Sequence, residues 1–238
     1  MSIDVAALTF DTGGTILDWH SGVSGALRRI GDGHGLDRPW AEIANDYRRR
    51  SLKKMLNAGG EAPASFNIDD AHREELEGII ADHDLGVFTA DEREALWRTW
   101  HELDAWPDFP AVLPKLRERY VVASFTILSV SLIVDTARRN GLSWDAVISC
   151  EMIGTYKLRP EAYRTAAKWL VLEPNRILMV ACHNVDLDAA RAVGFKTAFV
   201  RRPDEWGAEG PPDPAPNPAC DIIADDFPDL ARQLGVET

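Results

Sequence analysis

Short apolar segments alternate with helical patterns along much of the chain, and this alternation restricts the fold more than any other feature. The apolar runs lie at residues 5–10, 120–128, 145–150, 176–182 and 196–200. Each run has the length and composition of a buried strand, and the segments between the later runs have helical periodicity. Strands that alternate with helices predict an α/β fold with a parallel sheet covered by helices on both faces.

The pattern changes after the first apolar run, where helical periodicity persists with little strand signal. Three segments in this region begin with acidic residues, as many helices do, and they lie at residues 40–56, 69–83 and 90–103. A helical block inserted after the first strand would cover the carboxyl edge of the sheet. We therefore predict an α/β core formed by residues 1–18 and 106–238 and a helical cap formed by residues 19–105.

Polar residues occupy the positions where predicted strands end. Asp11 follows the first strand, Thr126 lies late in the second, and His183, Asn184 and Asp186 follow a later one. Parallel strands point their carboxyl ends toward one edge, and ligands bind at that edge in open α/β sheets. The sequence therefore predicts one site that collects these side chains.

The charge of the chain restricts its partners. The formal net charge is −12, which argues against nucleic acid and anionic membranes as partners. An anionic small substrate remains compatible with this charge if cations line its pocket. The chain has neither an apolar run long enough to span a bilayer nor a signal-peptide pattern, so we expect a cytoplasmic protein. Its three cysteines, Cys150, Cys182 and Cys220, have neither zinc-ligand nor disulfide spacing and fit a reducing compartment.

Three motifs identify a family. They are DTGGTILDW at residues 11–19, YKLRPEAY at residues 156–163 and MVACHNVDLDAARAVGFKTAFV at residues 179–200. In this order and spacing they resemble the haloacid dehalogenase (HAD) superfamily of hydrolases, and most closely the type II L-2-haloacid dehalogenases with their defluorinating relatives. The resemblance covers nearly the whole chain and is weakest in the predicted cap.

This resemblance implies a Rossmann-like core and a reaction. The reaction would be the hydrolytic dehalogenation of small 2-haloalkanoic acids through a covalent aspartyl ester, with no metal and no cofactor. The partner would be an anionic 2-halocarboxylate, and because dimers are common in the family, a homodimer is compatible with the resemblance.

Asp11 matches the family's nucleophile. A carboxylate in a glycine-rich turn at the edge of a sheet suits covalent catalysis, and the amides of Thr12 and Gly13 would bind a substrate carboxylate. The alternative is that Asp11 caps a helix in a tight turn. Phosphatases of the superfamily carry a general-acid aspartate at the position of Gly13. Because a leaving halide needs no proton, glycine at this position favours a dehalogenase over a phosphatase.

Two basic residues match family positions. Lys157 matches the lysine that neutralises and orients the nucleophile, whereas a lone lysine is more often solvated at the surface. Arg48 matches the cap arginine that receives the departing halide. Arg49 and Arg50 leave the register open, and we prefer Arg48 because it follows an aromatic residue, Tyr47.

The late motif supplies the remaining polar candidates. Asp186 matches the acid that holds Lys157 and positions water, and it would equally cap the helix that follows. His183 either activates the hydrolytic water, contacts the halide or makes structural hydrogen bonds; Asn184 lies in the same loop. Tyr163 either hydrogen-bonds within the site or is a half-buried structural residue.

One stretch departs from the family pattern. Where the family has Ser-Asn-Gly, this chain has Thr126, Ile127 and Leu128. Thr126 keeps a hydroxyl for the substrate carboxylate, but Ile127 loses a polar contact worth roughly 1–3 kcal/mol when buried. The departure leaves two alternatives open: a ring-opening or other hydrolase of a small carboxylate, and a catalytically silent binding homologue.

A third alternative is a Mg²⁺-dependent phosphatase. Asp11 with Asp186 or Asp188 would supply its metal ligands. Gly13 argues against this alternative.

Overall fold

The computed structural model of the chain describes residues 3–57 and 67–237. Its centre is a six-stranded sheet in the order β3-β2-β1-β4-β5-β6, and every pair of neighbouring strands is parallel. The strands are β1 (Ala7–Phe10), β2 (Val121–Thr126), β3 (Ala146–Ser149), β4 (Ile177–Ala181), β5 (Lys196–Val200) and β6 (Ile222–Ala224). The predicted α/β class with a parallel sheet is confirmed.

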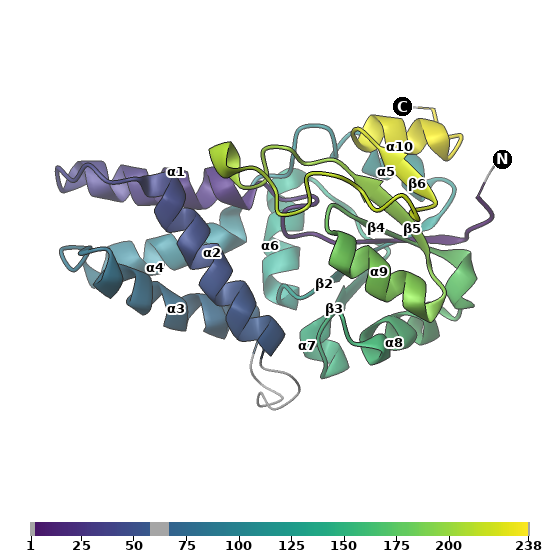
Figure 1. Ribbon diagram of the computed structural model, residues 1–238, viewed down its shortest axis with the longest axis horizontal. Helices are drawn as coiled ribbons and strands as arrows, with labels where there is room; N and C mark the ends of the chain where they lie inside the picture. Colours follow the sequence, from purple (N-terminus) through teal and green to yellow (C-terminus); the bar gives the residue numbers. More distant parts are fainter. Residues whose placement is uncertain (1–2, 58–66, 238) are drawn as a thin grey trace.

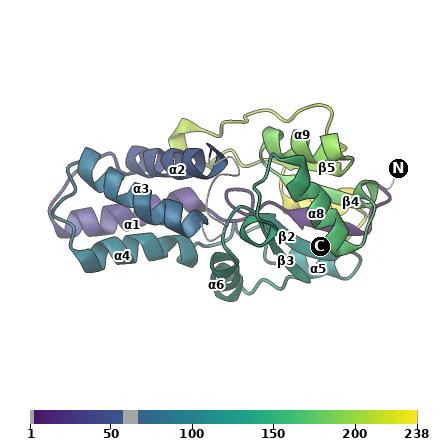
Figure 2. The ribbon, with the colours of Figure 1, turned by 90° about the horizontal axis from the view of Figure 1, so that it is seen from below.

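Helices lie on both sides of this sheet (Figure 2). They are α5 (Leu113–Arg117), α6 (Val130–Asn140), α7 (Cys150–Ile153), α8 (Pro160–Leu170), α9 (Asn184–Val193) and α10 (Phe227–Gln233). Phe10 pairs with Ser124, so the next residue, Phe125, points to the opposite face of the sheet. Phe10 packs against Phe227 of α10, and Phe125 packs edge-on against Tyr163 of α8. The strand pleat thus supplies apolar side chains to both helical layers.

The described residues between β1 and β2 are largely helical, and their long helices lie beside the sheet (Figure 1). It contains α1 (Trp19–Gly33), α2 (Trp40–Asn57), α3 (Ile68–Asp82), α4 (Ala90–Arg98) and the short 3₁₀ segment η1 (Thr99–Glu102). Reciprocal capping boxes begin two of these helices, with Asn67 and Asp70 in α3 and Thr89 and Glu92 in α4. The division into core and cap domains stays a prediction, and α1 begins where the predicted cap begins.

The observed helices and strands differ from the predicted ones in where some of them end and in two additional short helices. Gly141 and Gly194 end α6 and α9 in the left-handed conformation, with φ of 64° and 103°, because glycine adopts it without steric cost. The second strand ends at Thr126, and the Leu128 amide then donates to Thr126 Oγ1 at 3.0 Å and turns the chain. Helices α5 and α7 span about one turn each and were not predicted.

None of the described helices combines the length and the apolar character that a membrane span requires.

Candidate active site

The carboxyl edge of the sheet carries a cavity of about 290 Å³. Asp11 follows β1 directly, Lys157 lies in the loop before α8, and Asp186 is in the first turn of α9. The cavity is lined by Asp11, Gly13, Arg48, Leu52, Ile127, Lys157, Leu158, His183, Val185, Asp186, Trp206, Pro212 and Asp213. Residues from all three motifs and from α2 therefore share one space. Of the residues that the strand-end argument brings together, Asp11, His183 and Asp186 line this cavity, whereas Thr126 and Asn184 do not.

Lys157 bridges two buried carboxylates. Its Nζ donates to Asp11 Oδ1 and to Asp186 Oδ2, both at 2.8 Å. The second oxygen of each acid also has a hydroxyl partner: Thr15 Oγ1 donates to Asp11 Oδ2 at 2.7 Å, and Tyr163 OH donates to Asp186 Oδ1 at 2.6 Å. This network fixes the Asp11 carboxylate in position with every member paired.

The charges in this network decide the protonation of Asp11. Burial by itself would raise the pKa of Asp11, but the charge of Lys157, together with the hydrogen bond and charge of His183, holds that pKa below its ordinary value. Burial would likewise lower the pKa of Lys157, but the charges of Asp11 and Asp186 raise it. Asp11 is therefore a carboxylate and Lys157 an ammonium at neutral pH.

Arg48 reaches the cavity from α2 and, unlike Lys157, is not paired with a carboxylate in the described residues. It is 3% exposed, and among the described residues no acceptor contacts its Nε or Nη1. Its guanidinium carbon lies 5.6 Å from the Trp19 ring centroid and 5.5 Å from that of Trp100, within cation–π range. A Cβ at Gly13 would lie 2.8 Å from Arg48 Nη2, so the absence of a side chain at position 13 makes room for the guanidinium. Buried donors without partners are suited to an incoming anion.

The neighbouring arginines point elsewhere. Arg49 pairs with Glu209, and Arg50 pairs with Asp46 and Asp82, both at 2.7 Å. Both side chains are partly solvated. Of the three consecutive arginines, only Arg48 lines the cavity formed by the described residues.

His183 contacts the carboxylate of Asp11 at Oδ2, whereas Lys157 donates to the other oxygen, Oδ1. Its Nδ1 lies 3.4 Å from Asp11 Oδ2, and its Nε2 lies 2.9 Å from Glu205 Oε1. Glu205 was not predicted from the sequence. Burial alone would lower the pKa of His183, but contact with Cys182 and the carboxylates of Glu205 and Asp11 raises it well above its ordinary value.

Cys182, His183 and Glu205 also have the spacing of metal ligands, since their ligand-type atoms lie within 4.8 Å of one another. Burial, however, raises the pKa of the Cys182 thiol to about 11, so the thiol stays protonated at neutral pH. His183 and Glu205 are already paired with each other. We therefore describe the three as a hydrogen-bonded cluster.

Four predicted site residues lie behind the cavity wall. They are Thr12, Thr126, Tyr163 and Asn184. Thr12 Oγ1 donates to Thr126 Oγ1 at 2.7 Å, and both hydroxyls are buried. Thr126 thus supports the turn that follows Asp11, while its neighbour Ile127 lines the cavity.

Asn184 fastens the proline-rich segment to the start of α9. Its Nδ2 donates to Asp213 Oδ1 at 3.1 Å and to the Ala215 carbonyl at 2.9 Å, and its Oδ1 accepts from the Asn217 amide at 2.7 Å. These bonds place Pro212 and Asp213 in the cavity wall. Asn184 therefore shapes the cavity through the loop it holds.

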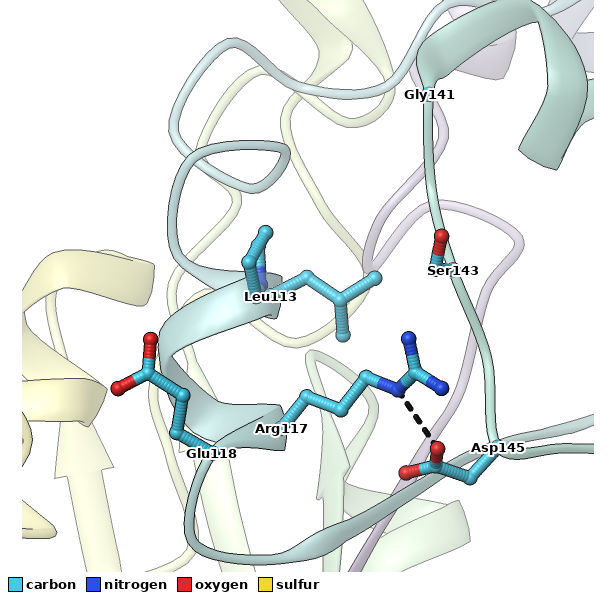
Figure 3. A pocket seen from close by; sticks show the side chains of 7 residues that line it. Leu113, Arg117, Glu118, Gly141, Ser143 and Asp145 are labelled. Carbon is cyan, nitrogen blue, oxygen red and sulfur yellow. Dashed lines mark hydrogen bonds and ion pairs between the residues drawn. The ribbon is translucent and has the colours of Figure 1, made fainter.

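A second hollow, of about 480 Å³, has different surroundings (Figure 3). Its main polar contact is an ion pair in which Arg117 Nε donates to Asp145 Oδ1 at 2.6 Å. Asp145 precedes β3, so this hollow lies at the amino edge of the sheet, opposite to Asp11. The ion pair is partly solvated, and such a pair contributes little to stability.

The comparisons with known proteins agree with this geometry. A sequence model of the haloacid dehalogenase-like hydrolases matches residues 5–194. The chain belongs to this family. Within the family, it is similar to a crystal structure of an L-2-haloacid dehalogenase, with 34% identity, a TM-score of 0.90 and coverage of 97% of this chain and 99% of that one.

Two further family members are also similar. A defluorinating L-2-haloacid dehalogenase is 34% identical with a TM-score of 0.88, and the alignment covers 97% of this chain and 95% of that one. An (S)-2-haloacid dehalogenase, 4A, of Burkholderia cepacia is 26% identical over 205 residues, or 82% of this chain and 83% of the relative. The predicted membership of the HAD superfamily is confirmed, and the chain is a hydrolase of this class.

Proposed function

We propose that this HAD-like hydrolase removes halide from small 2-haloalkanoic acids through an ester on Asp11, without a metal ion. The observation that carries the proposal is that one cavity holds both an ionised, hydrogen-bonded carboxylate and a buried guanidinium whose Nε and Nη1 have no acceptor among the described residues. Lys157 holds Asp11 at 2.8 Å, and Arg48 presents unpaired Nε and Nη1. The similar dehalogenases give the proposal independent support.

In the first step, an oxygen of Asp11 attacks C2 of the substrate from the side opposite the halogen. The carbon–halogen bond breaks, and the halide leaves with the bonding pair toward Arg48, which stabilises its charge. No proton is transferred, so Gly13 needs no acidic replacement. Backside attack inverts the configuration at C2. The turn amide of Gly13, which lines the cavity, binds the substrate carboxylate.

In the second step, water attacks Asp11 Cγ and releases the 2-hydroxy acid with one proton to solvent. Lys157 and Asp186 hold the carboxyl group throughout both steps. Leu52, Ile127 and Val185 form an apolar part of the cavity wall, and this part accommodates the carbon skeleton.

The metal-dependent phosphatase is disfavoured by the same contacts. In a magnesium site the carboxylates would converge on a cation, but here the Lys157 ammonium already lies between Asp11 and Asp186. Asp188, a further acid of the motif, is exposed and pairs with Arg191 at 2.6 Å. Gly13 cannot protonate a leaving alkoxide.

The test is halide release from 2-chloropropionate, bromoacetate and fluoroacetate in the presence of EDTA. We expect release from at least one acid, and we expect Asp11→Asn to lower it by at least about 10⁴-fold because the nucleophile is lost. Asp188→Asn, a matched change on exposed α9, should retain activity. A single turnover in ¹⁸O water should label Asp11.

Three outcomes contradict the proposal. They are the absence of halide release by the wild-type protein, turnover by Asp11→Asn, and phosphate release from p-nitrophenyl phosphate that depends on Mg²⁺. Binding of haloacids without turnover would instead support a silent homologue.

A further inference from the structure

Glu205 is a buried carboxylate to which the two-step reaction assigns no role. It lies in the segment after β5, and its side chain is 2% exposed. Glu205 Oε1 lies 2.9 Å from His183 Nε2 and accepts a longer bond from Trp19 Nε1 at 3.4 Å. A Cβ at Gly14, whose φ is +92°, would overlap this carboxylate, so glycine there permits its approach. Within residues 3–57 and 67–237, His183 is the only ion-pair partner of Glu205.

A carboxylate at this depth needs a compensating charge or donor, because removing a lone anion from water is strongly unfavourable. Neither Lys157 nor Arg48 lies within ion-pair distance of Glu205 in the described part of the chain. Trp19 and Cys182 donate longer bonds to Glu205. Arg48 acts on Glu205 only through its charge. The one close cationic partner of Glu205 in the described residues is the His183 imidazole, which also contacts the nucleophile.

The two nitrogens of His183 face different partners. Nε2 faces Glu205 at 2.9 Å, and Nδ1 faces Asp11 Oδ2 at 3.4 Å. Because a carboxylate accepts but does not donate, Glu205 requires a proton on Nε2. Neutral His183 is then the tautomer in which Nδ1 carries the free lone pair, and that lone pair points toward the carboxyl group on which the ester forms. The ring also lines the cavity, so water can reach it.

We propose that Glu205 and His183 act together as the base of the ester-hydrolysis step, with Glu205 fixing the ring and its tautomer so that Nδ1 takes the proton of the attacking water. His183 is the catalytic residue of the pair, and Glu205 is a positioning residue. The inference rests on the proposed function, because it requires the Asp11 ester.

The protons balance through one cycle. In the resting protein, His183 is an imidazolium between two carboxylates. Alkylation of Asp11 removes one of these negative charges, and His183 then releases its Nδ1 proton to solvent. Water attacks Asp11 Cγ and gives its proton to Nδ1, the ester carbon–oxygen bond at Cγ breaks, and the 2-hydroxy acid leaves. The carboxylate and the imidazolium are both restored, with one proton released per turnover.

The charged surroundings of His183 set the direction of its titration. The titratable and charged groups that face the ring or its partners are Asp11, Arg48, Lys157, Cys182, Asp186, Glu205 and Asp213. Two of them, Asp11 and Glu205, are anions in contact with the ring. Only the charge of Asp11 disappears in the ester. Glu205 therefore determines how basic His183 is during hydrolysis.

The decisive experiment separates the two chemical steps. The protein is mixed with 2-chloropropionate, quenched at intervals between pH 5 and pH 9, and examined by intact-protein mass for the ester and by halide release for alkylation. In the wild type, ester decay should accelerate with increasing pH as His183 loses its proton. His183→Gln should still alkylate, and its ester should decay roughly 10²-fold or more slowly.

Glu205→Gln tests the positioning residue. It keeps an acceptor at Nε2 but removes the negative charge that favours the imidazolium, so the pKa of His183 falls. The midpoint of the pH dependence of ester decay should then move to lower pH by about one unit, with a decay rate about tenfold lower at the plateau. Glu209→Gln, in the same segment but partly exposed, is the matched control and should leave the midpoint unchanged.

The outcomes distinguish this inference from the proposed function. If the wild type forms no ester and releases no halide, the proposed function fails. If the wild type alkylates normally but Glu205→Gln leaves the pH midpoint in place, Glu205 has only a structural role and the inference fails. Hydrolysis by His183→Gln at the wild-type rate would also overturn it.

Discussion

The two cations that line the cavity are held in opposite ways. Lys157 is bonded to two carboxylates, whose remaining oxygens each accept from a hydroxyl. Arg48 is equally buried, yet its Nε and Nη1 have no acceptor within the described part of the chain. On the Lys157 side of the cavity these hydrogen bonds are all made without a ligand. On the Arg48 side, Nε and Nη1 remain available to donate to a ligand. From this comparison we expect Lys157 to stabilise the protein and Arg48 to serve binding at a cost in stability.

Removing the charge of Lys157 should have the largest effect on stability. Lys157→Met keeps the length of the side chain but leaves Asp11 and Asp186 buried without their shared cation. We expect a loss of about 3–5 kcal/mol in the free energy of unfolding, measured by urea denaturation at pH 7. The exposed Lys168→Met on the neighbouring helix should change it by less than about 0.5 kcal/mol. An unchanged midpoint for Lys157→Met would contradict the comparison.

Removing the charge of Arg48 should produce the opposite pattern: it should lower activity without lowering stability. Arg48→Met deletes a buried cation whose Nε and Nη1 have no acceptor among the described residues, so the free energy of unfolding should stay equal or rise. The kcat for halide release should fall roughly 10²–10³-fold, because the leaving halide loses its stabilising charge. Arg49→Met, on the solvated side of α2, should affect neither quantity strongly. A destabilised Arg48→Met protein would show that Arg48 is structural.

Gly13→Ala should produce a smaller effect of the same kind. The added Cβ would lie 2.8 Å from Arg48 Nη2 and must displace the guanidinium, so we expect about a tenfold loss of kcat. In an Arg48→Met background the same change should cost nothing further, because the displaced group is absent. Gly33→Ala, where a Cβ meets nothing within 4 Å, is the control. If the losses of kcat were additive in the double variant, Gly13→Ala would not act through Arg48.

The sequence was sufficient to predict the sheet edge and the residues that its topology brings there. Asp11 and Asp186 follow buried strands, and the parallel arrangement makes their meeting a geometric necessity. Arg48 was preferred over its neighbours through a family resemblance, and the structure supplies the physical reason, since Arg49 and Arg50 have acidic partners on the solvated side.

Other contacts were beyond pattern reasoning. Glu205 is far along the chain from Gly14, which admits its carboxylate, and no local periodicity reports such a contact. Its place shortly after β5, at the same edge as Asp11 and His183, was the available signal. Thr126 shows the converse difficulty, because a hydroxyl at a strand end looks like a ligand contact until its bond to Thr12 is seen.

The way in which Asn184 holds the proline-rich segment has a consequence for redesign. One amide side chain and the rigid φ angles of several prolines fix this part of the wall, while none of the reacting groups belongs to it. Side chains of this segment other than Asp213 can therefore be exchanged, with Asn184 and its three bonds retained. Directed evolution toward bulkier acids has its natural starting point at residues 211–216, where the entrance can be widened while the chemistry beneath it stays in place.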